Sequence, residues 1–314
     1  MTSPPAIQKP KALRQGSRFA PIAPSSPARD DRTAAGEREL ERLGFSVAPR
    51  KAMKPEGYFA GPASARRAEI LAALQDSSIE ALVATRGGYG SAYLLNEGLP
   101  SSLPPIKPLV GFSDLTTLQI YLWQKHRWVT FYGPMLAAGL DSGYGVPHGY
   151  DLDSFSNALI KAGSGYALNL YGEPVGTGSA EGILLGGAMT LVEATLGTDW
   201  ELDTTNAILV LEDRAMKPYQ IDRVLLHLKH AGKFAHVRGI VLGDFPDCEP
   251  PVSDSPSVRD VAQRILGPLS IPIVFGVPVG HTTRPLLTLP LGVRARLSAE
   301  GSGTLEILEP AVTP

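Results

Sequence analysis

The sequence contains a single cysteine, Cys248, among 314 residues. One thiol cannot form a disulfide within the chain and has no second thiol with which to hold zinc, which is typical of a reducing compartment. An excess of charge of one sign is also missing, because 29 Lys and Arg nearly balance 31 Asp and Glu and leave a net charge of −2. Without a positive field to attract phosphate groups, nucleic acid and anionic lipid are not expected partners.

Long hydrophobic runs are absent as well. No stretch approaches the ~20 apolar residues that a membrane-spanning helix needs. An export signal also needs an uninterrupted apolar stretch, and Pro21, Pro24 and Pro27 interrupt the one at residues 20–28. We therefore expect a cytoplasmic protein that does not bind membranes. Residues 1–15 are expected to form a disordered N-terminal extension.

Hydrophobic residues make up 43% of the sequence, and its length exceeds what one core usually holds, so two domains are expected. Over residues 16–150, short apolar runs alternate with helix-like segments, which predicts a mainly parallel sheet covered on both faces. The glycine-rich residues 151–180 are interpreted as a linker. Residues 181–314 again mix helices with strands and form the second domain. The fold class is therefore α/β.

Loops that follow predicted strands carry residues capable of chemistry, and in open α/β sheets ligands bind at this edge. The glycines of residues 86–90 let backbone amides approach an anion, or they simply make a tight turn. At residues 111–114 an apolar strand ends and a helix begins at once. This geometry would present Ser113 as a nucleophile, although serine is also a common helix cap.

Two further loops offer an acid and a base. Glu212 ends the apolar run 207–211, where a carboxylate is costly unless a group such as a histidine ring pairs with it. An ordinary acidic strand exit is the alternative. His281 follows a glycine and is placed to reach across a cleft as a base. The other five of the six histidines lack a carboxylate cluster with metal-ligand spacing, so no metal is expected.

Ser113, Glu212 and His281 together form a triad hypothesis. The histidine would take the serine proton, and the carboxylate would orient the imidazole and support its charge. The order along the chain matches that of α/β-hydrolases, but the spelling Gly-x-Ser-x-Gly does not occur at Ser113.

At these residues the chain resembles the LD-carboxypeptidase family, the serine peptidases of family S66. This family includes the muramoyl-tetrapeptide carboxypeptidases and the microcin C immunity peptidases. The matching segments follow the family's order over most of the chain: RGGYG at 86–90, VGFSD at 110–114, GPM at 133–135, LLGGAMT at 184–190, LED at 211–213, YQIDR at 219–223 and PVGH at 278–281.

The resemblance implies a flavodoxin-like N-terminal domain that carries Ser113 and a smaller, β-rich C-terminal domain that carries Glu212 and His281. It implies an oxyanion hole made of the backbone amides of Gly88 and Asp114. It further implies a homodimer that needs no metal or other cofactor.

The activity implied is hydrolysis of the L,D-peptide bond of cytoplasmic murein tetrapeptide, which releases the terminal D-alanine during peptidoglycan recycling. Arg86 and Tyr89 are expected to contact this small peptide. One alternative is an immunity peptidase of the microcin C type that cleaves a peptidyl or aminoacyl nucleotide. A second alternative is a non-catalytic peptide-binding module, against which the intact set Ser113, Glu212 and His281 argues.

Overall fold

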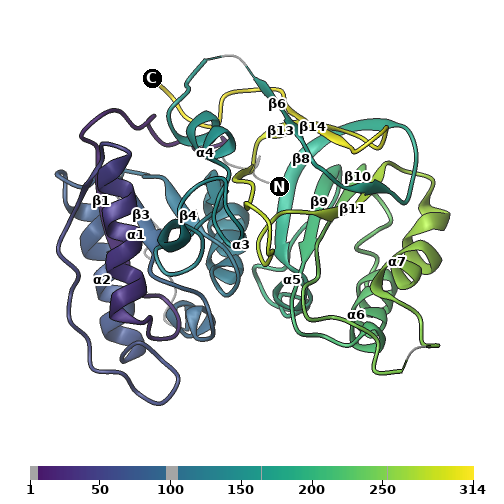
Figure 1. Cartoon of the computed structure of the whole chain (residues 1–314), viewed down its shortest axis with the longest axis horizontal. Helices are drawn as coiled ribbons and strands as arrows, with labels where there is room; N and C mark the ends of the chain where they lie inside the picture. Colours follow the sequence, from purple (N-terminus) through teal and green to yellow (C-terminus); the bar gives the residue numbers. More distant parts are fainter. Residues whose placement is uncertain (1–5, 97–104, 164, 253) are drawn as a thin grey trace.

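Two β-sheets lie side by side in the computed structural model, which describes residues 6–96, 105–163, 165–252 and 254–314 (Figure 1). The first sheet has the strand order β12-β5-β4-β3-β1-β2. Strands β1 to β5 are parallel and lie in the order 2-1-3-4-5, which is the flavodoxin-like arrangement. Strand β12 pairs antiparallel to β5. These strands are β1 (Arg18–Ile22), β2 (Ser46–Val47), β3 (Ala81–Ala84), β4 (Leu109–Gly111), β5 (Thr130–Tyr132) and β12 (Leu289–Leu291).

The second sheet has the order β6-β14-β13-β8-β9-β10-β11-β7, with a parallel centre from β8 to β11 and antiparallel strands on both sides. The predicted α/β fold, with a flavodoxin-like sheet and a second sheet-containing domain, is confirmed. The strands are β6 (Tyr166–Asn169), β7 (Glu173–Pro174), β8 (Ser179–Ala188), β9 (Ala207–Glu212), β10 (Gly239–Gly243), β11 (Ile273–Val277), β13 (Arg294–Ser298) and β14 (Thr304–Ile307).

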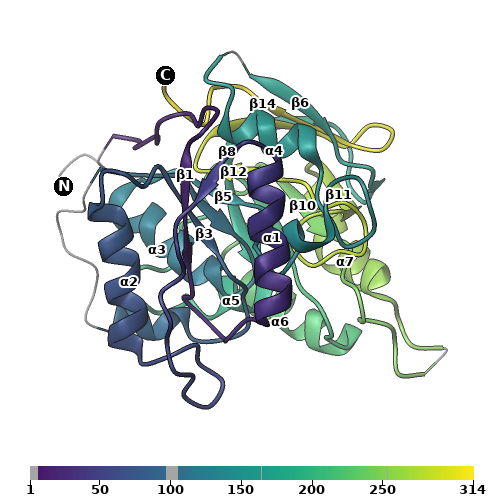
Figure 2. The same cartoon turned by 60° about the vertical axis from the view of Figure 1, so that its left-hand side comes forward.

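Helices cover both sheets. Figure 2 shows α1 in front of the first sheet, and Figure 1 shows α6 and α7 on the outer side of the second. Where the two halves meet, α3 contacts α5 and β8. The helices are α1 (Asp30–Arg42), α2 (Ala63–Gln75), α3 (Leu115–His126), α4 (Leu152–Leu159), α5 (Met189–Glu193), α6 (Pro218–His230) and α7 (Val258–Leu266), with short 3-10 turns η1 (Ser91–Leu95), η2 (Leu140–Ser142) and η3 (Gly267–Leu269). None of the helices in the described part of the chain is long and apolar enough to span a membrane.

The strands that lead to the site are buried along their whole length. Every residue of β3, β4 and β9 is buried. A parallel strand with helices on both faces must be apolar on both faces, which explains why these segments read as continuous hydrophobic runs. Within these three strands the one polar side chain is that of Glu212, the last residue of β9.

Two segments that the sequence predicts to be a linker or disordered are built into the structure. Residues 151–180 contain α4, β6 and β7, and β6 pairs with β14 at the edge of the second sheet. Residues 1–5 of the predicted N-terminal extension lie outside the described residues. In residues 6–15, Leu13 is buried, and Gln8 and Lys11 pair with Trp128 and Thr313. Prolines remove hydrogen-bond donors only at their own positions, so the residues between them still pair.

The C-terminal half also returns to the first sheet. After the loop that carries His281, β12 pairs with β5, and Leu289 on this strand is fully buried. Loop and strand are consecutive, so the docking of β12 limits where His281 can lie.

Leu289→Ala is predicted to lower the free energy of unfolding by about 2–5 kcal/mol, because it removes buried methyl groups and leaves a cavity at the junction of the two halves. Urea denaturation followed by circular dichroism measures this change. The matched control is Leu226→Ala on α6, whose side chain is 41% exposed. Equal losses in both variants would contradict the anchoring role of β12.

Candidate active site

Ser113 occupies a strained turn between β4 and α3. Its φ is +63°, in the left-handed region that residues other than glycine rarely adopt. Only Asp114 separates it from the first residue of α3. A serine on such a strand-to-helix turn has its hydroxyl lifted above the sheet edge, which is the geometry of a nucleophile elbow. The strain is held in place by surrounding contacts, as is common at functional sites.

Gly87 supplies one of these contacts. A Cβ on Gly87 would lie 2.7 Å from the Cβ and 2.8 Å from the Oγ of Ser113, so only glycine fits against the serine. Asp114 provides a second set of contacts that hold the turn. Its buried carboxylate accepts hydrogen bonds from the Ser25 hydroxyl at 2.5 Å and the Ser91 amide at 2.7 Å. The loops that follow β1 and β3 are thereby tied to the turn that holds Ser113.

The backbone amides of Gly88 and Asp114 are available to a ligand. Neither N–H has a hydrogen-bond acceptor among the described residues. The φ of Gly88 is +110°, and a Cβ there would lie 2.4 Å from the Ser26 hydroxyl oxygen, so the position requires glycine. Two unsatisfied donors beside a serine hydroxyl are suited to hold an oxyanion.

Glu212, at the end of β9, is fully buried and receives three hydrogen bonds. The ring Nδ1 and the backbone amide of His281 lie 2.8 and 2.9 Å from its Oε2, and the Tyr132 hydroxyl donates to its Oε1 at 2.5 Å. The carboxylate keeps the ring proton on Nδ1 and leaves Nε2 free to accept a proton. Gly280 makes this approach possible, because a Cβ there would lie 2.4 Å from the carboxyl carbon of Glu212.

The charges of Glu212 and His281 shift the pKa values of the two groups in opposite directions. Burial alone would raise the pKa of Glu212, but the His281 charge and the hydrogen bonds outweigh it and hold this pKa below its usual value. Burial alone would lower the pKa of His281, but the charge of Glu212, its hydrogen bond to the ring and the charge of Asp213 together outweigh burial and raise this pKa. The carboxylate therefore makes it easier for Nε2 of His281 to take up a proton than it would be in an isolated histidine.

Tyr132 connects the acid to the serine turn. Besides donating to Glu212, its hydroxyl accepts a hydrogen bond of 3.4 Å from the amide of Ser113. Burial and the neighbouring carboxylate raise the pKa of Tyr132 far above its ordinary value, so the hydroxyl remains a donor. Sequence reasoning missed this residue. Its only signal is that it directly precedes the segment GPM at 133–135.

Two other contacts that the sequence did not reveal hold the loops around the pair. Asp213 accepts from both the amide (3.0 Å) and the hydroxyl (2.8 Å) of Thr190. Asp244, after β10, accepts from Arg284 and from Thr282 in the loop that carries His281. These bonds join segments far apart in the sequence and have no local pattern.

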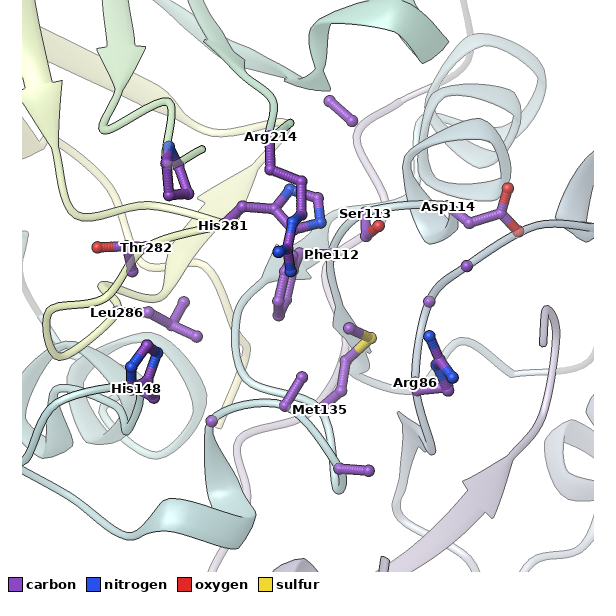
Figure 3. A pocket seen from close by; sticks show the side chains of 18 of the residues that line it. Arg86, Phe112, Ser113, Asp114, Met135, His148, Arg214, His281, Thr282 and Leu286 are labelled. Atoms are coloured by element: carbon purple, nitrogen blue, oxygen red, sulfur yellow. The ribbon is translucent and has the colours of Figure 1, made fainter. Parts of the chain in front are cut away.

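The predicted residues converge on one cavity of about 1150 Å³. Ser113, Asp114, Gly88, Arg86 and Tyr89 line it from the first half and His281 from the second. Figure 3 shows His281 and Ser113 beside each other, with Arg86 on the far side of the serine turn. The rings of Phe112 and His281 pack edge to face, with their centroids 5.2 Å apart. Glu212 lies behind His281 and does not line the cavity.

No hydrogen bond joins Ser113 and His281 in the part of the chain that the structure describes. Such bonds are often long in enzymes without substrate and shorten when it binds. Nor do three or more His, Cys, Asp or Glu side chains within the described ranges converge to hold a metal ion. What the cavity offers is a hydroxyl, an imidazole backed by a carboxylate, and two free amides, which together suit acyl transfer.

Comparison with known proteins identifies two matching family models. The LD-carboxypeptidase N-terminal domain matches residues 20–133, and the LD-carboxypeptidase C-terminal domain matches residues 181–297. The chain is 34% identical over 306 residues to the probable murein peptide carboxypeptidase of Bacillus subtilis, which covers 95% of this chain and 94% of that protein.

Solved structures agree in fold. The muramoyltetrapeptide carboxypeptidase from Oxalobacter formigenes superimposes with a TM-score of 0.83 at 28% identity, covering 94% of this chain and 99% of that one. The chain is also 27% identical over 308 residues to the microcin C7 self-immunity protein MccF of Escherichia coli, with 88% of each covered. MccF in complex with glutamyl sulfamoyl guanosine superimposes with a TM-score of 0.86 at 23% identity, covering 97% of this chain and 99% of that one, which by itself shows only a shared fold.

Replacing Glu212 with Gln is predicted to lower the pKa of His281. In the wild type burial lowers this pKa and the Glu212 carboxylate raises it, and without the charge of Glu212 burial and the charge of Arg214 are opposed only by the weaker effect of Asp213. NMR titration of the histidine ring nitrogens should therefore find the wild-type value above about 6.5 and the variant value below the wild-type one. Glu193→Gln removes a carboxylate 2.7 Å from the exposed His227 and should leave His281 unchanged. An unchanged pKa in Glu212→Gln would contradict the ion pair.

Proposed function

The chain belongs to the LD-carboxypeptidase family of peptidases, and from this we propose that it removes the terminal D-alanine of murein tetrapeptide through a serine acyl-enzyme. The observation that carries the proposal is the meeting of Ser113 and the His281–Glu212 pair, which come from different halves of the chain, at one cavity. The 34% identity to a murein peptide carboxypeptidase over nearly the whole chain supports the choice of substrate.

In the proposed first step, the Oγ of Ser113 attacks the carbonyl carbon of the scissile bond while its proton passes to Nε2 of His281. The amides of Gly88 and Asp114 hold the negative oxygen that forms. His281 then gives the proton to the leaving nitrogen, the C–N bond breaks, and D-alanine departs, which leaves an ester on Ser113. In the second step water gives one proton to His281 while its oxygen bonds to the carbonyl carbon, the ester bond to Ser113 breaks, and His281 returns the proton to the Oγ of Ser113.

The remaining parts of the site have supporting roles in this mechanism. Glu212 stabilises the imidazolium that exists between the two proton transfers, and Tyr132 fixes the carboxylate. Arg86 and Tyr89 line the same cavity on the side of the serine turn and would contact the peptide that is retained as the ester. The proposal includes a cytoplasmic setting, a role in peptidoglycan recycling and a homodimer, each of which follows from the family.

A second candidate function is an immunity peptidase that cleaves an aminoacyl nucleotide. The volume of the cavity supports this candidate. At about 1150 Å³ it exceeds the roughly 300–1,000 Å³ of typical small-molecule sites and so has room for a nucleotide. Incubating the protein with murein tetrapeptide and with aspartyl sulfamoyl adenosine, followed by mass spectrometry, separates the two functions. D-Alanine released from the first compound alone supports the tetrapeptide assignment, and cleavage of the second compound alone supports the immunity function.

Ser113→Ala is predicted to lower kcat for D-alanine release from the tetrapeptide by about 10³-fold or more, because no ester can form. Ser142→Ala is the matched control, since Ser142 lines the same cavity without a role in the mechanism. Release at the wild-type rate by Ser113→Ala would show that another group is the nucleophile.

Gly87→Ala is predicted to lower kcat by at least about 100-fold, because its Cβ would displace the hydroxyl of Ser113, and a shift of about 1 Å has this cost. The free energy of unfolding should stay close to the wild-type value, since Gly87 has no positive φ and alanine can adopt its backbone conformation. Gly163→Ala, where a Cβ meets open space, is the control for the backbone effect of alanine. Turnover by Gly87→Ala equal to that of the control would contradict the assigned position of the nucleophile.

A further inference from the structure

A carboxypeptidase must distinguish a free terminal carboxylate from the middle of a chain, and the proposed mechanism says where that carboxylate lies. His281 gives its proton to the leaving nitrogen, so the released residue sits beside the imidazole. Its carboxyl carbon is two bonds from that nitrogen, about 2.5 Å away. A group that binds this carboxylate must therefore be close to His281.

Arg214 meets this requirement. It comes two residues after Glu212, directly beyond the end of β9, and it lines the cavity together with His281. Figure 3 shows its side chain extending into the cavity in front of His281 and Phe112. Its positive charge also lowers the pKa of His281, in opposition to Glu212, which is consistent with this proximity.

The other arginines of the cavity occupy different places. Arg29 and Arg32 belong to the start of α1 and pair with Asp31 and Asp141. Arg86 follows β3 and donates to the Pro27 carbonyl at 3.3 Å. It is the neighbour of Gly87, which abuts Ser113, so its backbone lies on the nucleophile side of the cavity.

The side chain of Arg214 can exchange its partner, while its backbone is held. It pairs with Asp247 at 2.7 Å, and the two side chains are 56% and 61% exposed. Ion pairs this exposed contribute little, so a substrate carboxylate can replace Asp247. On either side of Arg214, the Asp213 carboxylate is fixed by Thr190, and the amide of Ala215 donates to the Pro246 carbonyl at 3.0 Å.

We propose that Arg214 binds the free carboxylate of the residue that is released and so restricts the enzyme to the last residue of a peptide. This inference rests on the proposed function. A guanidinium is suited to the task because its planar fork matches a carboxylate with two parallel hydrogen bonds.

The test compares two substrates, the tetrapeptide with a free C-terminal carboxylate and the same tetrapeptide with a C-terminal amide. For the wild type and Arg214→Met, kcat/KM is measured by mass spectrometry of released D-alanine or D-alaninamide. For Arg214→Met, kcat/KM on the tetrapeptide with a free carboxylate is expected to fall about 10- to 100-fold, since one charge-assisted hydrogen-bond partner is gone. On the amidated tetrapeptide kcat/KM should change little. The preference for the acid should therefore collapse, and Arg214→Lys should restore part of it.

Arg29→Met is the matched control, because it also removes one positive charge but from another part of the cavity. This variant should keep the wild-type preference for the acid over the amide. Thermal unfolding at the wild-type temperature would show that Arg214→Met is folded. The inference is overturned if Arg214→Met keeps the preference, if Arg86→Met abolishes it in place of Arg214→Met, or if the wild type has none. Failure of the wild type to release D-alanine from the acid would instead refute the proposed function, and this inference with it.

Discussion

A buried carboxylate, Glu212, is the group on which the arrangement of the site depends. An ionised carboxyl group with no exposure to water is very costly unless donors surround it, and here three donors come from two segments of the chain. Tyr132 belongs to the first sheet, and His281 belongs to the loop between β11 and β12. The hydrogen bond from Tyr132 therefore ties the first sheet to the second at the site.

Close backbone approach is the second constraint. Glycine at 87 lets one loop rest on Ser113, and glycine at 280 lets another rest on Glu212. In both places a single methyl group would displace a side chain that the proposed mechanism uses. The strain in the left-handed backbone of Ser113 is offset by other contacts, the hydrogen bonds that the carboxylate of the adjacent Asp114 accepts from Ser25 and Ser91.

The charges around the cavity divide it into two sides. The serine turn, the free amides and Arg86 form one side, and His281 and Arg214 form the other. In an acyl transfer this division separates the part of the peptide that is retained from the part that leaves.

The sequence alone determined which residues end the buried strands. Apolar runs that stop at Ser113 and Glu212 identified two parts of the candidate site, and the glycine before His281 identified the third, because a polar group at a strand end is a local feature. Sequence reasoning also predicted the α/β class from the alternation of strands and helices. The ordered match to a known family added the flavodoxin-like sheet, and it also favoured Ser113 as a nucleophile over Ser113 as a helix cap, which the local pattern had left open.

Only the tertiary structure decided how these residues meet. The link from Tyr132 to Glu212, the return of β12 to the first sheet, the pairing of the N-terminal residues with Trp128 and the position of Arg214 all join segments distant in the chain. Local patterns specify whether a side chain is buried or exposed, but a contact between two sheets depends on how they pack and on which buried polar groups must then be satisfied.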